Sequence, residues 1–275
     1  MKSVFFTGAT GGLGEVCVRA LAARGWQVFA AGTNADKLAA LAKIPGVIPL
    51  HCDVMDDASV QAARAEVLRH TDRLDAVVNF AGLTAFASLV EGDPVPAARR
   101  MVEVNLMGMV RINAALFGLV HAARGRIVNC SSSAGWMTAQ PFAGAYVASK
   151  RAVEGYSDSL RRELIFLGIP VVKLQPGPFR TGMMDDIHRG FEQTLADSPL
   201  YGHRLRRLRG ILLAALGRPR APQELVGKLL RALEDARPRR QYRAGSPRLL
   251  LALEVLPEGM IDALFRLAAR WAGRG

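Results

Sequence analysis

A chain of 275 residues, half of them hydrophobic and 22% charged, is long enough to bury a full core and too apolar to be intrinsically disordered. Its formal net charge is +12, and nearly all of this surplus is carried by the residues from Arg204 onward. Three widely spaced cysteines, Cys17, Cys52 and Cys130, suit neither a disulfide framework nor a metal cluster, so we expect buried thiols, a cytoplasmic protein and no bound metal.

Membrane-spanning and nucleic-acid-binding functions receive little support. We find no apolar run near the roughly 18 to 20 residues of a spanning helix. The segment Met1–Phe6 leads directly into a glycine-rich turn, which leaves no room for the apolar core of a signal peptide. The basic C-terminal part fits an anionic membrane surface, nucleic acid or a role in solubility alone. Because no recognition motif accompanies it, we expect no nucleic-acid partner.

Short apolar runs with strand character alternate along the chain with segments of helical spacing. Strands are predicted at Ser3–Phe6, Gln27–Ala31, Val47–His51, Ala76–Asn79, Arg126–Cys130 and Val171–Gln175. Helices are predicted at residues 13–24, 35–42, 57–69, 97–122 and 144–167. Apolar strands that are each followed by a helix indicate a parallel sheet covered on both faces. With right-handed crossovers, this pattern predicts a single-domain α/β fold over residues 1–275, a Rossmann-type doubly wound sheet.

Polar or glycine-rich residues follow each predicted strand, at the edge where such sheets bind ligands. The first strand leads into a turn that holds Gly8, Gly11, Gly12 and Gly14 and opens a helix. Glycines there allow a tight turn and bring backbone N–H groups close to a pyrophosphate at the positive end of the helix dipole. The sequence therefore predicts a dinucleotide site, although a purely structural turn would also favour glycine.

The second strand lacks the acidic residue that usually binds the ribose hydroxyls of NAD. Thr33 and Asn34 stand there instead and could donate to a 2′-phosphate, so we expect NADP or NAD with a weak preference for NADP. Asn34 or Asp36 also suits the cap of the following helix. Asp53, after the third strand, could accept from the adenine amino group or cap its own helix.

Tyr146 and Lys150 lie four residues apart, so on a helix they share one face. A nearby ammonium stabilises a phenolate, and we therefore expect Lys150 to lower the pKa of Tyr146. Such a tyrosine is suited to general acid/base interconversion of an alcohol and a carbonyl. A serine from Ser131–Ser133, after the fifth strand, is predicted to lie beside it.

The chain resembles the short-chain dehydrogenase/reductase family. The motifs that carry the resemblance span residues 4–181 in the expected order: Thr7-Gly8-x-x-x-Gly12-x-Gly14, Asn79-x-Ala81-Gly82, Asn105, Ile127–Ser132, Tyr146-x-Ala148-Ser149-Lys150 and Pro176-Gly177-x-x-x-Thr181. The resemblance implies hydride transfer with a nicotinamide cofactor and Tyr146 as the acid/base residue. Lys150 would hold the nicotinamide ribose, a serine would polarise the substrate oxygen, and Asn105 would hold a water in a proton relay behind Lys150.

By this resemblance the catalytic residues are Asn105, Ser132, Tyr146 and Lys150. The cofactor site is assigned to Gly8, Thr10, Gly12, Leu13, Gly14, Thr33, Asn34, Asp53, Val54, Asn79, Ala81, Gly82, Tyr146, Lys150, Pro176, Gly177, Phe179 and Thr181.

Three departures from the family pattern stand out. The spacing Gly8-x-x-Gly11-x-x-Gly14 also fits the epimerase-like branch, so an epimerase-like or non-catalytic dinucleotide-sensing protein is the alternative function. Phe80 replaces a second asparagine after Asn79. Strand phase selects Ser132 as the catalytic serine, whereas the family's usual spacing to the tyrosine selects Ser133; we choose Ser132.

Residues 183–217 are predicted to form a flap over the substrate. Its apolar face is assigned to Met183, Met184, Ile187, Phe191, Leu195, Leu200 and Tyr201, with Met137, Phe142 and Phe179 as further wall. We therefore expect a hydrophobic alcohol or its ketone or aldehyde as substrate, of a steroid, retinoid or aryl-ketone kind.

Residues 237–275 are predicted to be a basic, amphipathic extension, similar to the tails of the retinol- and hydroxysteroid-dehydrogenase-like branch. In Met260–Trp271 an apolar stripe runs beside Arg266 and Arg270. Such a helix fits packing on its own domain, packing on a partner subunit, or contact with an anionic membrane. The resemblance further implies a homodimer or homotetramer, associated through the helices that carry Asn105 and Tyr146.

Overall fold

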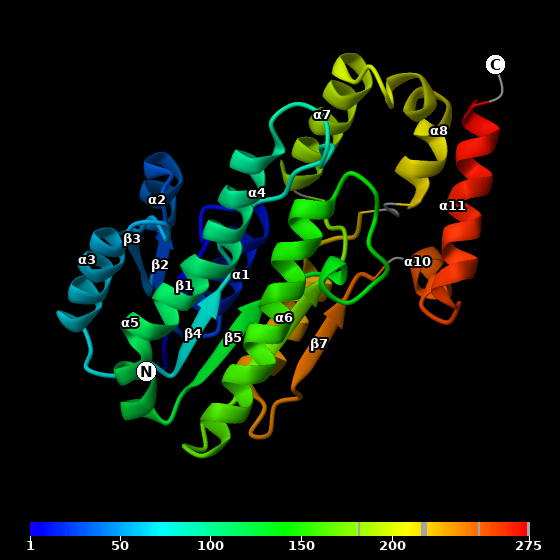
Figure 1. The fold of residues 1–275 in the computed structure, drawn as a ribbon. Coiled ribbons are helices and arrows are strands. Elements are labelled where there is room, and N and C mark those ends of the chain that lie inside the picture. The colour runs from blue at the N-terminus through cyan, green and yellow to red at the C-terminus, as the bar shows by residue number, and fades with distance from the viewer. Residues whose placement is uncertain (181, 216–218, 247, 274–275) are drawn as a thin grey trace.

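The computed structural model describes residues 1–180, 182–215, 219–246 and 248–273 (Figure 1). Its centre is a seven-stranded parallel sheet with the order β3-β2-β1-β4-β5-β6-β7. The strands are β1 (Ser3–Thr7), β2 (Gln27–Gly32), β3 (Val47–His51), β4 (Ala76–Asn79), β5 (Arg126–Cys130), β6 (Val171–Pro176) and β7 (Gln241–Ala244). The predicted α/β class, with a doubly wound parallel sheet, is therefore confirmed.

Helices cover both faces of this sheet (Figure 1). They are α1 (Gly12–Ala23), α2 (Ala35–Leu41), α3 (Asp57–Leu68), α4 (Pro94–Val102), α5 (Gly108–Ala123), α6 (Gly144–Ile165), α7 (Gly182–Asp197), α8 (Gly202–Ala215), α9 (Gln223–Glu234), α10 (Arg248–Leu253) and α11 (Glu258–Gly273). A π-helical turn, η1 (Glu103–Met107), joins α4 to α5, and a 3₁₀ turn, η2 (Ser133–Gly135), precedes α6. The strand order reverses between β1 and β4, which places the ligand crevice of such folds at the carboxyl ends of these strands.

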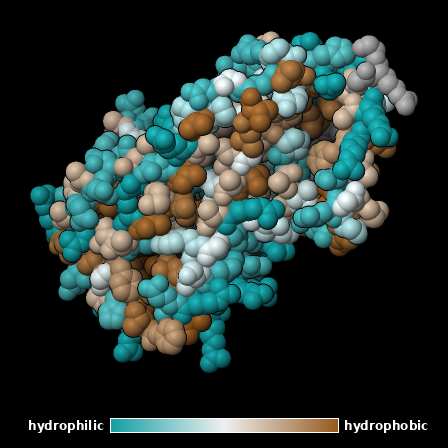
Figure 2. Space-filling view, viewed as in Figure 1, coloured by the Kyte–Doolittle hydropathy of each residue, from teal (hydrophilic) through white to brown (hydrophobic). Residues whose placement is uncertain are grey.

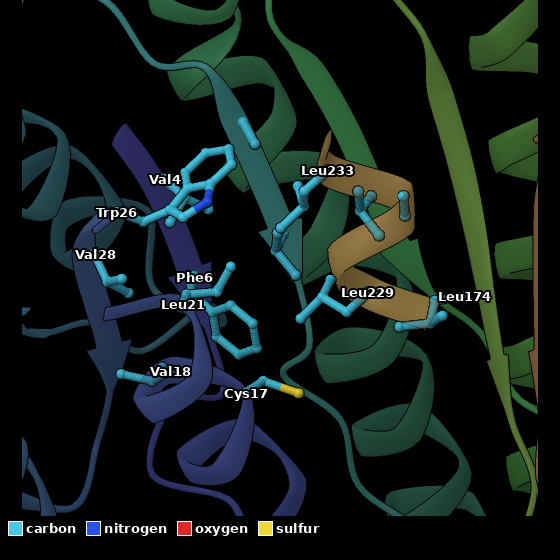
Figure 3. Packing of buried hydrophobic residues seen from close by; sticks show 14 of the residues in the cluster. Val4, Phe6, Cys17, Val18, Leu21, Trp26, Val28, Leu174, Leu229 and Leu233 are labelled. Carbon is cyan, nitrogen blue, oxygen red and sulfur yellow. The ribbon is translucent and has the colours of Figure 1, made fainter. Parts of the chain in front are cut away.

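Two buried clusters hold the helices to the sheet. On one face, α1 and α9 meet across β1, and Figure 3 shows Leu21 and Trp26 beside Leu229 and Leu233. On the other face, α3, α5 and the end of α6 pack on the same strands. The near-continuous apolar strands predicted from the sequence are buried on both sides for this reason. All three cysteines are, as predicted, buried free thiols.

One strand was missed by the sequence analysis. β7 lies within the segment predicted to be a basic extension, and it pairs with β6 at the edge of the sheet. It has only four residues, and just Tyr242 and Ala244 point into the core, while Arg243 faces solvent. A short edge strand with a charged outer face lacks the continuous apolar run of the central strands. Part of the C-terminal segment therefore belongs to the sheet.

The expectation of no membrane-length helix was also wrong by length and composition. The continuous helix Pro94–Ala123 is long and apolar enough to cross a membrane, and 39% of its most apolar window is buried. The predicted start of this helix, residue 97, was three residues late. Ile112, Leu116 and Val120 of α5 lie in the core beneath the sheet, so at least one face of this helix is a packing surface.

The predicted flap forms α7 and α8 and packs through an aromatic cluster. Phe191 of α7 contacts Phe86, which stacks on Phe142, and Phe142 meets Tyr201 edge-on. Leu200, assigned to the apolar face, is 60% exposed instead, because it lies in the turn between the two helices. The Met183 side chain and residues 216–217 lie outside what the structure describes. At the C-terminus, α11 packs against α8.

Candidate active site

The glycine turn after β1 is sterically restricted to glycine at two positions. Gly8 has a φ of +68°, and a Cβ there would lie 2.7 Å from the carbonyl carbon of Phe80 and from the amide nitrogen of Ala81. A Cβ on Gly14 would lie 2.0 Å from the carbonyl oxygen of Gly8. The Phe80 and Ala81 amides donate to Thr7 Oγ1 at 3.0 and 3.1 Å, which ties the end of β4 to the turn.

This turn fits the phosphate cradle predicted from the sequence. The α1 helix begins after Gly11, which offers no side-chain cap, so the first-turn amides at Gly12 and Leu13 lack that partner. Gly11 and Gly12 are exposed and Leu13 is half-buried. Uncapped amides at the positive end of a helix are the donors that a pyrophosphate requires. The residues present therefore fit a dinucleotide at this edge of the sheet.

A cation near the end of β2, Lys37 of α2, was not predicted from the sequence. Thr33 and Asn34 are exposed, but Asn34 Oδ1 accepts from the amide of Lys37 at 2.9 Å and so caps α2. This outcome matches the capping alternative for Asn34. Lys37 Nζ donates to the carbonyl oxygen of Thr10 at 3.0 Å, which brings an ammonium to the rim of the cradle. The sequence indicated Lys37 only through its position, three residues after the helix cap Asn34.

Two residues after β3 have different surroundings from those predicted. Asp53 does not cap α3, because Asp56 does so by accepting from the amides of Ala58 and Ser59. Asp53 Oδ1 accepts instead from the backbone amide of Met55 at 2.9 Å, and the carboxylate is half-buried. The Val54 side chain is buried against α5, where a Cβ on Gly108 would lie 2.6 Å from Val54 Cγ2. Only the backbone of Val54 is left for a ligand.

Asn79 lies within a buried polar network rather than on the cradle surface. Its Nδ2 donates to Asn113 Oδ1 at 2.8 Å and to Asn129 Oδ1 at 2.9 Å. Asn129 in turn donates to Ser157 Oγ at 3.0 Å, so β4 and β5 are joined to α5 and α6. The Asn79 side chain therefore has a structural role, and the place of this residue in the cofactor site stays a prediction. Phe80, where the family has a second asparagine, packs on Phe6 with ring centroids 5.0 Å apart.

Asn105 is fully buried in the π-helical turn and holds the loop after β4. Its Oδ1 accepts from the amide of Leu83 at 2.7 Å, and its Nδ2 donates to the Leu83 carbonyl oxygen at 3.0 Å and to Ser149 Oγ at 2.9 Å. Gly82 lies between Asn105 and Lys150: a Cβ there would be 3.2 Å from Asn105 Oδ1 and 3.4 Å from Lys150 Nζ. π-Turns of this kind are frequent at functional sites.

Tyr146, Lys150 and Ser132 come together at the carboxyl end of β5. The Ser132 side chain interacts with the Tyr146 hydroxyl and acts to lower its pKa. Lys150 Nζ lies 5.9 Å from the centroid of the tyrosine ring and donates to the carbonyl oxygen of Cys130 at 3.1 Å. Both side chains project from α6, one turn apart, as the spacing predicted.

The acid/base electrostatics of this group differ from the prediction. Burial raises the pKa of Tyr146 to about 12, although the interaction with Ser132 opposes the rise. Burial also lowers the pKa of Lys150 below its usual value. Desolvation of the phenol therefore outweighs the opposing effect of Ser132, and the predicted lowering of the Tyr146 pKa is not found.

The three consecutive serines have distinct surroundings. Ser131 Oγ is directed at the carbonyl oxygen of Lys150, 3.5 Å away. Ser132 is buried, accepts from the amide of Ala134 at 3.1 Å and so caps the 3₁₀ turn. Ser133 begins that turn and is half-buried. The structure therefore brings Ser132 to the tyrosine, and its catalytic role stays a prediction.

The segment after β6 contributes mainly backbone. Pro176 ends the strand, and the Gly177 amide donates to the Ala244 carbonyl oxygen at 2.7 Å. Phe179, assigned both to the cofactor site and to the substrate wall, is buried in the core between β6 and α9, so its ring faces neither. Met137 is also buried, whereas Phe142 is half-buried in the aromatic cluster. Thr181 lies outside the described residues.

Comparisons with known proteins agree with this arrangement. Residues 2–191 match the model of the short chain dehydrogenase family. The chain is similar to human 17-beta-hydroxysteroid dehydrogenase type 6, with 33% identity over 95% of this chain and 86% of that protein. Its identity to mouse retinol dehydrogenase 16 is 32%, over 96% of this chain and 87% of that one.

A solved short-chain dehydrogenase from Streptomyces avermitilis superposes with a TM-score of 0.76 and 25% identity, over 98% of this chain and 96% of that one. The family match covers the whole run from the glycine turn to the flap, and both full-length relatives carry dehydrogenase names. The chain thus belongs to the short-chain dehydrogenase/reductase family, in its retinol- and hydroxysteroid-dehydrogenase branch, and is an NAD(P)-dependent oxidoreductase.

Proposed function

We propose that the enzyme interconverts a hydrophobic alcohol and its ketone or aldehyde, with Tyr146 as the general acid/base residue. The arrangement of Tyr146 and Lys150 one turn apart on α6, with Ser132 beside the tyrosine at the end of β5, carries this proposal. A bound nicotinamide dinucleotide supplies or accepts the hydride. The protein orients the substrate oxygen and moves the proton.

In the reductive direction the Tyr146 hydroxyl donates its proton to the substrate oxygen. The raised pKa keeps the phenol protonated near neutral pH, so it is ready to act as an acid. Ser132 donates a hydrogen bond to the same oxygen. Lys150, held by the Cys130 carbonyl, would hold the nicotinamide ribose, and Asn105 would hold the relay water behind it.

The decisive experiment compares two tyrosines on the same helix. Tyr146→Phe removes the acid/base hydroxyl, and we expect turnover to fall at least about a thousandfold while cofactor binding is retained. Tyr156→Phe is the matched control, because its hydroxyl accepts from Asn113 Nδ2 at 3.0 Å within the structural network. It should keep most of the activity. Retained turnover in Tyr146→Phe would refute the mechanism, and cofactor binding without turnover of any substrate would favour a dinucleotide-sensing protein.

We further infer that NADP is preferred over NAD. The end of β2 carries no carboxylate to repel a 2′-phosphate, and the ammonium of Lys37 lies at the cradle rim beside Thr10. Lys37→Ala should weaken NADPH binding about tenfold and leave NADH binding within about twofold, measured by nicotinamide fluorescence. An unchanged ratio of the two affinities would contradict this assignment.

The substrate proposal rests on the relatives' names and on the wall of the site. One relative is a hydroxysteroid dehydrogenase and another a retinol dehydrogenase. Phe86, Phe142, Phe191 and Tyr201 form an aromatic cluster where the flap meets the body of the protein. A panel of steroids, retinoids and aryl ketones, each assayed with both cofactors by nicotinamide absorbance, tests the class. If no compound of the panel is turned over with either cofactor, the proposed substrate class is refuted.

We also propose a cytoplasmic homodimer or homotetramer that associates through α4, α5 and α6. Val95 and Val102 on α4 and Met107 at the end of the π-helical turn that leads into α5 are exposed apolar residues. The buried free thiols fit a reducing compartment. Sedimentation equilibrium tests the association, and a monomer at micromolar concentration would contradict it.

A further inference from the structure

A row of charged and titratable side chains runs along the side of α6 that faces the sheet. Four of them recur every fourth residue and so project from one face of the helix: Tyr146, Lys150, Glu154 and Asp158. α6 packs on β6 (Figure 1), where the ammonium of Lys173 lies 2.8 Å from Glu154 Oε2 and 2.9 Å from Asp158 Oδ1. We name these five side chains the α6 charge row.

Glu154 is held at the centre of the α6 charge row. Its side chain is 13% exposed, and while Oε2 pairs with Lys173, Oε1 accepts from Gln175 Nε2 at 2.8 Å. Gly135 of η2 closes the position from another side, since a Cβ there would lie 3.0 Å from Glu154 Cγ and 3.0 Å from the Lys150 carbonyl oxygen. Burying a carboxylate is costly unless it is paired and hydrogen-bonded, and both conditions are met here.

The network around this carboxylate extends to β7 and to the wall of a cavity. Arg243 Nε donates to Gln175 Oε1 at 3.4 Å, and the guanidinium lies 3.6 Å from the ring centroid of Trp136. Trp136 lines a cavity of about 890 Å³ beside α11, where Figure 2 shows hydrophobic side chains around a hollow. Because Gln175 stands between Arg243 and Glu154, the arginine orients the amide and does not pair with the carboxylate.

The two carboxylates of the row are compensated by different cations. Both share Lys173, but Asp158 has a second cation, because Arg161 Nε lies 3.8 Å from its Oδ1. The other ammonium next to Glu154 is that of Lys150, one turn earlier on α6. Lys150 and Lys173 are both buried. Glu154 therefore lies between two buried ammonium groups, one of which belongs to the candidate active site.

The burial of Lys150 makes a neighbouring negative charge important. Burial lowers the pKa of this lysine, and two neighbours oppose the effect, Cys130 and Glu154. Burial also raises the pKa of Cys130 to about 11, so near neutral pH this thiol carries no charge. Near neutral pH, then, Glu154 supplies the negative charge that acts on Lys150.

We propose that Glu154 is a positioning residue of the reaction, whose carboxylate keeps the Lys150 ammonium charged and in place for the ribose of the cofactor. This inference rests on the proposed function of Lys150. It predicts two opposite effects: without the negative charge of Glu154 the lysine is harder to protonate, and without the positive charge of Lys173 it is easier to protonate. A carboxylate that only joined α6 to β6 would cause neither.

The pH dependence of NADPH binding tests the proposal without any substrate. Lys150 loses its charge as pH rises, so we expect the affinity, measured by nicotinamide fluorescence between pH 7 and 10, to fall on the alkaline side. In Glu154→Gln the midpoint of this fall should move to lower pH by at least about half a unit. Lys173→Gln should move the midpoint to higher pH. For any substrate that is turned over, the alkaline limb of kcat/KM should move in the same directions.

Two further variants separate charge from structure. Asp158→Asn is the matched control, because it removes the other carboxylate that pairs with Lys173, one turn farther from Lys150, and should leave the midpoint unchanged. Glu154→Asp keeps the charge and should stay closer to wild type than Glu154→Gln does. Thermal melting of each variant verifies that it is folded. If Glu154→Gln does not fold, the opposite shift in Lys173→Gln decides the question.

A last variant, Lys150→Met, distinguishes failure of this inference from failure of the proposed function. It should weaken NADPH binding at neutral pH and abolish the alkaline fall. If Lys150→Met binds NADPH like wild type at every pH, the proposed role of Lys150 is wrong, and the inference is wrong with it. If Lys150→Met abolishes the fall but neither Glu154→Gln nor Lys173→Gln moves the midpoint, the inference alone is overturned and Glu154 has only a structural role.

Discussion

Asn105→Ala should be among the most destabilising single changes at this site, for reasons that do not depend on catalysis. The side chain is fully buried and makes two hydrogen bonds with the backbone of Leu83, one with Ser149 Oγ and a long one to Met101 Sδ. Removal leaves the amide and carbonyl of Leu83 and the Ser149 hydroxyl without these partners. A buried polar group left unpaired costs about 1 to 3 kcal/mol.

Leu83 is half-buried, so water can replace part of its lost bonding, and the sum is smaller than three full penalties. We expect the free energy of unfolding to fall by about 3 kcal/mol in Asn105→Ala. For a chain of this length, that loss lowers Tm by about 5 °C. Ser149→Ala removes one buried partner and should cost only about 1 kcal/mol.

Urea unfolding of the wild type, the two single variants and the double variant measures these terms. The coupling energy between Asn105 and Ser149 should be about 0.5 to 1.5 kcal/mol, because they share one hydrogen bond. A loss below about 1 kcal/mol in Asn105→Ala, with no coupling to Ser149, would refute the view that this asparagine holds the loop after β4 in place.

Three further predictions concern the turn, the tyrosine and the C-terminal contact. Gly14→Ala should weaken NADPH binding more than about tenfold, measured by calorimetry, because the added Cβ would lie 2.0 Å from the Gly8 carbonyl oxygen. An unchanged affinity would show that the glycine turn can rearrange to accept the side chain. Burial raises the pKa of Tyr146 to about 12, so between about pH 10 and 12 the folded chain keeps a proton that the unfolded chain loses. The unfolding free energy should therefore fall as pH rises through that window, and Tyr146→Phe should flatten the fall, in denaturation series at each pH. Glu254→Ala should increase deuterium uptake at Thr138 and its neighbours, because the carboxylate that accepts from them is removed; unchanged uptake would contradict this prediction.

Much of the fold follows from local pattern. Central strands such as Val4–Phe6 and Val77–Val78 are apolar at every position because both sheet faces are covered, and that signal needs no tertiary information. β7 has no such signal, since an edge strand alternates Tyr242 and Ala244 with a solvent-facing Arg243. Its place in the sheet depends on pairing with β6, which lies far away in sequence.

The candidate active site likewise has features that follow from local sequence pattern and features that depend on the tertiary structure. Spacing alone placed Tyr146 and Lys150 on one face of a helix, and strand phase selected Ser132, because helical and strand periods are local properties of the chain. The direction of the Tyr146 pKa could not be read in this way, since it depends on how deeply the phenol is buried. Nor could the bond from Lys37 to Thr10 be predicted in this way, since it joins helix α2 to the glycine turn after β1. The sequence by itself determined which residues lie at the ligand edge of the sheet; only the tertiary structure decided which of them, like Val54, Asn79 and Phe179, turn their side chains into the interior, because burial is a property of the packed chain.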